Sequence, residues 1–141
     1  MSTVLWANLL ADGVVTSEAA DRDALYKHAD RLDALCTSLG LPPFQGLLDT
    51  TDLRYNMDDD AELPEGVTST NELMAKGGVW MDAQEAIAYL DRLVSHIRTQ
   101  KVRFGLLNNQ HDDVVQELEE VIAFARGAAS PGDRFNFSVV M

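Results

Sequence analysis

The longest amphipathic pattern in the chain runs from residue 82 to residue 98 and predicts a central helix. Asp82 is a good N-cap residue, and Glu85 three positions later completes a capping box, in which each side chain satisfies a backbone N–H at the helix start. Apolar residues then recur at gaps of three and four, which places them on one helical face. They are Ala83, Ala86, Ile87, Leu90, Leu93, Val94 and Ile97. Such a face must be buried against the rest of the chain.

Three further segments carry helical signals. Residues 17–39 repeat apolar positions at helical spacing and are followed by Gly-Leu-Pro-Pro, which ends a helix. Residues 69–76 open with a second capping box and predict a short helix. Asn108 or Asn109 can cap a last helix, which ends near Gly127. The chain is therefore predicted to contain three main helices and one short one.

Strand patterns lie at both ends of the chain. Residues 3–10 are almost wholly apolar, which suits a strand buried on both faces. Asp12-Gly13 and the short apolar run Val14-Val15 follow, and an Asp-Gly pair between apolar runs is a hairpin signal. Residues 134–141 alternate apolar and polar side chains, which predicts a half-buried strand. Residues 102–107 fit either a strand or a loop between two helices, and Gly105 weakens both interpretations.

Neither terminal strand could be stable alone, and the simplest arrangement that stabilises both is one sheet in which they pair. We therefore predict a single domain over residues 1–141, of the α+β class. Its small, mostly antiparallel sheet would combine the N-terminal hairpin with the C-terminal strand. The three main helices would cover one face of this sheet.

The least regular part of the chain is also the most acidic. Residues 49–65 contain seven of the 23 acidic residues and one base, Arg54, so this segment carries half of the formal charge of −12. It has no apolar stripe to bury and ends in Pro and Gly. We interpret it as a surface loop within the domain, because too little chain lies on either side for two separate cores.

The global charge excludes some partners. A formal charge of −12 argues against nucleic-acid binding, which needs clustered Lys and Arg, and against anionic membrane surfaces. It would speed the encounter with a basic protein, although acidity also serves plain solubility. A single Cys and an N-terminal stretch without a basic region favour a reducing cytoplasm. No apolar run is long enough to span a bilayer.

No catalytic, metal or cofactor site is predicted. Asn56, Asp58, Asp60 and Glu62 alternate like the start of a calcium loop, but the sixth position is Ala and the twelfth is Val. Cys36 lies on the apolar stripe of its helix, where a buried thiol is inert. The histidines and the cysteine lack the paired spacing of a zinc site, and no nucleophile elbow or phosphate-binding glycine loop is present.

The function predicted from these patterns is non-enzymatic protein binding. An acidic module that recognises a basic partner would fit, for example an inhibitor or immunity-type protein, or a regulatory subunit. The binding surface would combine acidic side chains with an aromatic ring and a thioether, which are enriched in interfaces. Its predicted residues are Asp52, Tyr55, Met57, Asp58, Asp59, Asp60 and Glu62.

Two alternatives stay open at this point. One is a small hydrolase-like enzyme whose site is assembled from scattered carboxylates, and the other is a self-associating structural protein. An enzyme should show a deep pocket with converging polar groups, whereas a homo-oligomer should expose an apolar patch.

Overall fold

The computed structural model describes residues 3–57 and 62–141 and has an α+β fold. A five-stranded sheet forms its centre, in the order β2 (Val14–Arg22), β1 (Val4–Ala11), β5 (Arg134–Val140) and β3 (Leu48–Asp49), with β4 (Met81–Asp82) also paired to β5. All pairs are antiparallel except β3 with β5. The predicted pairing of the N-terminal hairpin with the C-terminal strand is therefore confirmed.

The hairpin turn forms at Asp12 and Gly13, as predicted. Their φ angles are 52° and 79°, the left-handed pair that a two-residue hairpin turn needs. The second arm is much longer than predicted, because residues 17–22 continue β2 instead of starting a helix. Ser17 does not open a helix; it pairs with Asn8 of β1, and its hydroxyl donates to the Asn8 side-chain oxygen at 2.6 Å. Residues 17–22 thus adopt strand structure because they pair with the long apolar strand β1.

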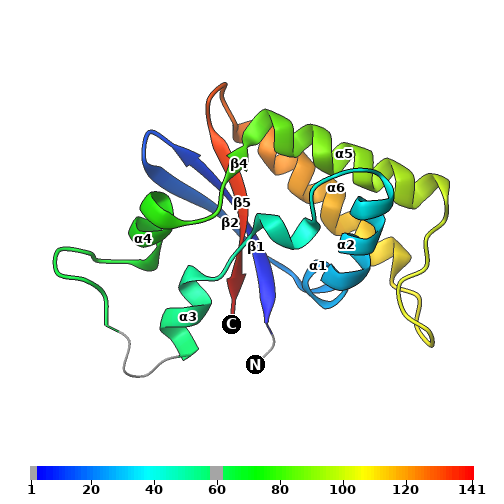
Figure 1. Ribbon diagram of the computed structural model, residues 1–141, viewed down its shortest axis with the longest axis horizontal. Helices are drawn as coiled ribbons and strands as arrows, with labels where there is room; N and C mark the ends of the chain where they lie inside the picture. The colour runs from blue at the N-terminus through cyan, green and yellow to red at the C-terminus, as the bar shows by residue number, and fades with distance from the viewer. Residues whose placement is uncertain (1–2, 58–61) are drawn as a thin grey trace.

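Helices cover both faces of the sheet. Figure 1 shows α1 (Asp23–Lys27), α2 (Ala29–Ser38), α5 (Ala83–Thr99) and α6 (His111–Ala128) on one side, and α3 (Thr51–Met57) with α4 (Thr70–Gly77) on the other. A short 3-10 helix, η1 (Phe44–Leu47), inserts Phe44 into the core. The three predicted main helices, now α1 with α2, α5 and α6, therefore cover one face as predicted, whereas the short helices α3 and α4 cover the other.

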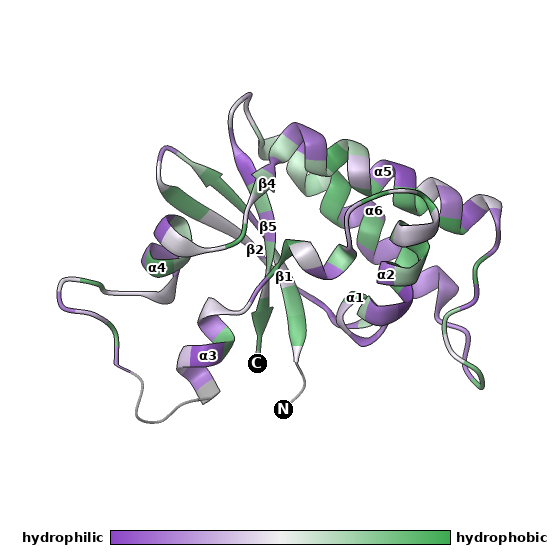
Figure 2. Cartoon of the chain, viewed as in Figure 1, coloured by the Kyte–Doolittle hydropathy of each residue, from purple (hydrophilic) through white to green (hydrophobic). Residues whose placement is uncertain are grey.

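The predicted central helix, α5, is confirmed together with its cap. The Asp82 carboxylate accepts a hydrogen bond from the Glu85 N–H at 3.1 Å. Green and purple segments alternate along α5 and α6 in Figure 2, as expected for amphipathic helices. All seven apolar positions of the predicted stripe are buried, and they pack in one core with α6, α1, α2 and the sheet.

Strand β5 lies in the interior of the sheet, and both of its faces are buried. The prediction of a half-buried strand is therefore wrong: the alternate positions Asn136 and Ser138 are buried as well as the phenylalanines. Asn136 satisfies its polar groups inside the sheet, because its side-chain oxygen accepts from Asn8 at 2.9 Å and its amide donates to the Val79 carbonyl at 2.8 Å. Hydrogen bonding compensates for the burial of these polar side chains.

Residues 102–107 belong to the connection between α5 and α6, so the loop interpretation is the correct one. Val102 and Phe104 anchor this connection in the core, whereas Leu106 and Leu107 are exposed. Asn109 stabilises the start of α6, because its side-chain oxygen accepts from the His111 N–H at 3.1 Å.

Candidate functional site

A cleft of about 380 Å³ opens between β3, α3, α4 and the segment before β4. Its lining residues include Asp49 from β3, Arg54 and Tyr55 from α3, Leu73 from α4, and Val79. This cleft lies where the predicted acidic segment enters the fold. It is therefore the place where the sequence-based prediction of a binding surface can be compared with the structure.

Asp49 holds the base of this cleft together. Its side chain is buried, with 3% exposed, and accepts hydrogen bonds from the backbone N–H groups of Thr51 and Val79, both at 2.9 Å. The surface-loop prediction is wrong at this position, because backbone donors replace the water that a buried carboxylate would otherwise lose. A Cβ at Gly78 would lie 2.7 Å from the Asp49 carboxylate and 2.5 Å from the Met74 carbonyl. Only glycine allows this close approach.

Asp52 also has a structural role. One carboxylate oxygen accepts from the Thr70 hydroxyl at 2.8 Å, and the other accepts from the Asn56 amide at 2.8 Å. Residues 51–57 are helical, so this part of the predicted loop is regular structure. The Thr70 contact joins α3 to the first residue of α4, so the Asp52 carboxylate is already hydrogen-bonded within the fold.

The other predicted site residues are distributed around the end of α3. Tyr55 is half-buried in the cleft wall, and the Arg54 guanidinium carbon lies 5.2 Å from the centre of its ring, in cation–π range. Glu62 is exposed. Met57 is the last residue of α3, but its side chain lies outside the described structure, as do residues Asp58, Asp59 and Asp60. The acidic residues at the centre of the prediction thus stay a prediction.

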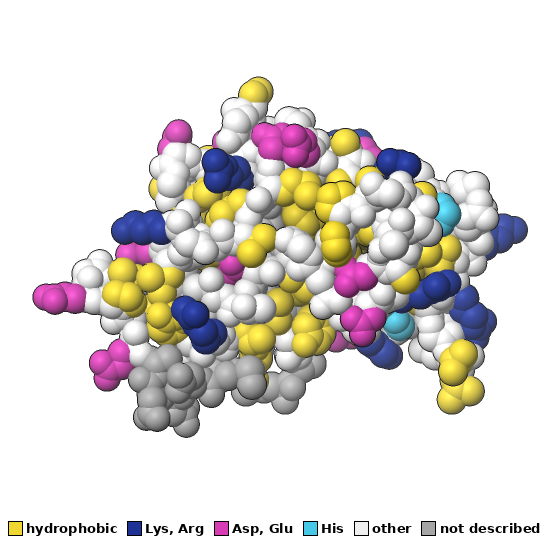
Figure 3. All heavy atoms as spheres, in the orientation of Figure 1, with side chains coloured by type: hydrophobic (Ala, Val, Ile, Leu, Met, Phe, Trp, Pro, Cys, Tyr) yellow, Lys and Arg dark blue, Asp and Glu magenta, His cyan; other side chains and the backbone are white. Residues whose placement is uncertain are grey.

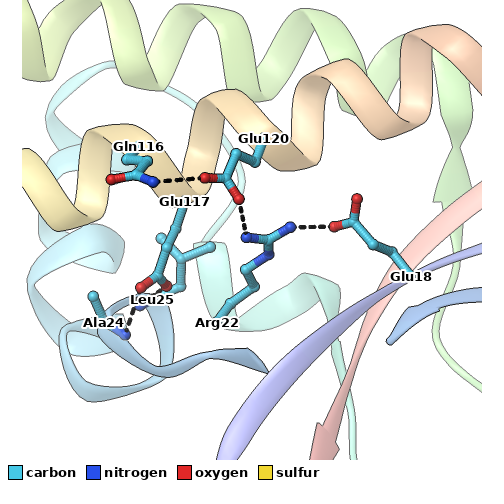
Figure 4. A network of polar contacts seen from close by, with 7 residues as sticks. All are labelled: Glu18, Arg22, Ala24, Leu25, Gln116, Glu117 and Glu120. Carbon is cyan, nitrogen blue, oxygen red and sulfur yellow. Dashed lines mark hydrogen bonds and ion pairs between the residues drawn. The ribbon is translucent and has the colours of Figure 1, made fainter. Parts of the chain in front are cut away.

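A second polar cluster, centred on Arg22, escaped the sequence-based prediction (Figure 4). The Arg22 side chain is only 6% exposed and donates to Glu18 of the same strand and to Glu120 of α6, the latter at 2.5 Å. Burial alone would lower the pKa of Arg22, but hydrogen bonds and the charges of both glutamates outweigh it and raise that pKa. The cluster fastens the edge strand β2 to α6. No local signal could reveal it, because Arg22 and Glu120 are 98 positions apart.

Glu117 of α6 caps a helix from outside. Its carboxylate accepts from the backbone N–H groups of Ala24 at 3.2 Å and Leu25 at 3.1 Å, in the first turn of α1 (Figure 4). Burial raises the pKa of Glu117, and the two backbone hydrogen bonds offset only part of that rise. The residue is a structural tie between α6 and α1 whose ionised form is disfavoured by folding.

The raised pKa of Glu117 predicts how the free energy of unfolding depends on pH. Because the folded-state pKa of Glu117 lies above the ordinary value of 4.5, the free energy of unfolding should fall as pH rises above 4.5. Glu117→Gln should reduce this fall, because glutamine carries no charge. Its single amide oxygen can replace only one of the two carboxylate acceptors, so the variant should also be less stable at every pH. The measurement is urea denaturation at a series of pH values from about 4 to 8.

Glu120→Gln is the matched control one turn along the helix. Hydrogen bonds from Arg22 hold the pKa of Glu120 below 4.5, so its stabilising contribution is lost as pH falls through the lowered pKa. Glu120→Gln should therefore change the curve on the acid side. Equal curves for wild type and Glu117→Gln above pH 4.5 would contradict the role of Glu117.

Cys36 lies in the core, as the apolar stripe of its helix predicts. It is fully buried, and its sulfur lies 3.0 Å from the Tyr89 hydroxyl. The Tyr89 hydroxyl donates to the Pro42 carbonyl at 2.8 Å, which leaves the thiol to donate to the hydroxyl oxygen. Burial raises the pKa of Cys36, so little of the reactive thiolate forms. This pair connects α2, α5 and the segment after α2.

Within residues 3–57 and 62–141, no group of three or more His, Cys, Asp or Glu side chains is placed to hold a metal ion. In the same part of the chain, no helix has the length and apolar character needed to cross a bilayer. The chain matches no protein-family model, no curated protein and no solved structure. The candidate site therefore stands on its geometry alone.

Proposed function

We propose that the protein is a non-enzymatic binding module that recognises a basic protein partner through the α3 cleft and the acidic segment that follows it. The proposal rests on one observation, that the acidic segment begins next to an aromatic-lined cleft. Tyr55 lines a cleft of about 380 Å³, and the chain that leaves α3 supplies most of the acidic residues between positions 49 and 65. Dense negative charge suits Lys and Arg side chains of a partner, and Tyr55, whose ring already contacts Arg54, adds aromatic contact area.

Hydrogen bonds within the fold support the walls of the cleft in the free protein. Asp49 ties β3 to the start of α3 and to Val79, and Asp52 ties α3 to α4. Side chains that are already ordered lose little conformational entropy on binding, which favours affinity. The acidic residues outside the cleft would act mainly on the encounter rate, because exposed charges steer a partner of opposite sign.

Binding is favoured over catalysis by the state of the cleft carboxylates. Asp49, which lines the cleft, and Asp52, which lies next to the cleft residue Thr51, each accept two hydrogen bonds within the fold, so the oxygens of both carboxylates are already engaged there. An inhibitor or immunity-type protein that blocks a basic enzyme, or a regulatory subunit, is the class that this chemistry fits. The proposal places it in the reducing cytoplasm, consistent with its single buried, unpaired Cys.

The proposal predicts a charge-dependent association rate. The partner would be captured from native cell extract at low salt, identified and purified, and it should carry net positive charge. Changing Asp58, Asp59 and Asp60 together to Asn should leave the free energy of unfolding almost unchanged. Association should slow by on the order of tenfold at low salt, and its salt dependence should flatten. Stopped-flow or surface-binding kinetics at low and physiological salt provide the measurement.

A matched variant separates local charge from global charge. Asp12, Asp23 and Asp30 are exposed and lie outside the acidic segment, so changing all three to Asn removes the same charge elsewhere. This control should retain most of the wild-type rate. If the two triple variants behave alike, the acidic segment has no special role, and if the captured partner is not basic, the proposal fails.

A further inference from the structure

Two adjacent leucines project from the connection between α5 and α6. The exposed fraction is 92% for Leu106 and 101% for Leu107, whereas the next most exposed large apolar residue of the described chain, Val14, reaches 65%. Burying a leucine side chain is worth roughly 1.5–3 kcal/mol relative to leaving it in water. Two leucines side by side in solvent would therefore gain free energy if a partner buried them.

The connection holds this tip in a defined shape. The Arg103 guanidinium donates to the carbonyls of Gly105 at 2.9 Å and Leu106 at 2.7 Å. Below the tip, the Asn109 side-chain oxygen accepts from the Phe104 N–H at 3.0 Å, and Phe104 is buried in the core. Gly105 has a φ of +102°, and a Cβ there would lie 2.5 Å from the Asn108 carbonyl. The leucines are thus presented by an ordered loop, which lowers the entropy lost on docking.

The tip is also positively charged, unlike the molecule as a whole. Lys101 and Arg103 are exposed on the same connection, in a chain whose formal charge is −12. Figure 3 shows dark-blue Lys and Arg side chains gathered near a yellow projection at the right-hand end, where Figure 1 places this connection. The matching surface should therefore be an apolar hollow with negative charge at its edge.

The same chain carries such a hollow. A cavity of about 340 Å³ lies along the first half of α5, with an apolar lining that includes Leu41, Met81, Ala88 and Tyr89. Glu85 and Arg92 are the two charged residues of this lining. The Arg92 guanidinium donates to the Leu39 carbonyl at 2.9 Å, next to the end of α2, and Glu85 is the residue that can pair with a basic side chain. The volume falls in the range of cavities that accept small ligands and side chains.

The tip cannot fill the cavity of its own molecule. Ala88 lies eleven residues before the end of α5 at Thr99, which is roughly 16 Å at the standard helical rise. The connection then leads away from the first half of α5, as Figure 1 shows. A leucine tip that fills this cavity must therefore belong to another molecule.

We propose that the Leu106–Leu107 tip of one molecule docks into the α5 cavity of a second copy. The leucines would bury against the apolar lining, and Lys101 and Arg103 would approach Glu85. If each molecule of a pair inserts its tip into the other, the assembly closes as a dimer; otherwise it extends head to tail. One loop and one small cavity bury little area, which is typical of a reversible contact. This contact is separate from the α3 cleft and does not depend on its function.

Sedimentation velocity tests the proposal over about 1 µM to 1 mM, the range expected for a small interface. The wild-type protein should show a mass that increases with concentration. Each single change, Leu106→Ser or Leu107→Ser, should weaken association about ten- to a hundredfold, and the double variant should stay monomeric. Val14→Ser with Leu63→Ser removes exposed apolar residues elsewhere and should associate like wild type.

A mixing experiment distinguishes tip-in-cavity docking from general stickiness. Ala88→Arg should fill the cavity with a long side chain and leave the variant monomeric. When this variant is mixed with the Leu106→Ser/Leu107→Ser variant, one intact tip and one intact cavity remain, so a one-to-one complex should form. Thermal unfolding by circular dichroism establishes that each variant is folded. If Ala88→Arg does not fold, sedimentation of the Leu106→Ser/Leu107→Ser variant decides the test by itself.

The proposal is overturned if the wild-type protein stays monomeric at 1 mM or if the double tip variant associates like wild type. It is also overturned if the two folded variants do not combine. Flotation with phosphatidylserine-containing vesicles is a further arm of the experiment. Tip-dependent vesicle binding without self-association would assign the leucines to an anionic lipid surface instead, which also overturns the proposal.

Discussion

Deleting residues 134–141 is expected to abolish cooperative folding. These residues include all of β5, which is paired with β1, β3 and β4, so its loss divides the sheet. Phe135 and Phe137 are fully buried and contact each other edge to face, with ring centres 5.1 Å apart. Truncating one buried phenylalanine costs about 3–5 kcal/mol, and typical domains are stable by only about 5–15 kcal/mol in total. The deletion removes two, together with the central strand.

Near-ultraviolet circular dichroism and urea denaturation would measure this outcome. The deletion variant should lose its fixed aromatic signal and show no cooperative transition. Removing Met141 alone is the control, because this residue follows β5 and is 40% exposed, and its loss should leave the transition nearly intact. A deletion variant that unfolds cooperatively as a soluble monomer would contradict the central position of β5.

Leu90→Ala should lower the free energy of unfolding by about 2–5 kcal/mol. Leu90 is fully buried in the middle of α5, where that helix packs against the sheet and α6. The change removes apolar contacts and leaves a cavity that the surrounding core can close only in part. Chemical denaturation at constant pH gives the difference directly if the slope with denaturant is unchanged.

Gln84→Ala on the same helix is the matched control. Gln84 is exposed, so its change should alter the free energy of unfolding by no more than about 0.5 kcal/mol. If Leu90→Ala costs as little as this control, the buried face of α5 is wrongly assigned. The pair thus compares a buried and an exposed position on one helix.

Much of the fold could be predicted because its signals are local or periodic. The cap of α5 involves Asp82 and Glu85, only three positions apart, and its stripe repeats with the helical period. The hairpin depends on Asp12 and Gly13, which adopt left-handed angles within a single turn. The pairing of the two apolar terminal strands could be predicted because neither strand can bury its side chains alone. These features need no knowledge of distant contacts.

The candidate site was predictable only in outline. Local charge density located an acidic segment, and Tyr55 of that segment does line a cleft. The cleft itself, however, depends on Val79, whose N–H binds Asp49 from 30 positions away. Asp49 looked like one more surface acid because the sequence does not show which backbone donors will surround a carboxylate.

The sequence by itself determined the α+β class, the central helix, the hairpin turn and the pairing of the two ends of the chain. Only the tertiary structure decided that residues 17–22 extend β2, since that depends on pairing with β1 and on the Arg22–Glu120 contact with α6. It alone buried both faces of β5, where the Asn8 amide donates to the Asn136 side-chain oxygen across 128 positions. It also separated Phe104, which enters the core, from Leu106 and Leu107, which stay in solvent. The physical reason is range: caps, turns and periodicity act within a few residues, whereas burial is decided by neighbours that the whole fold brings together.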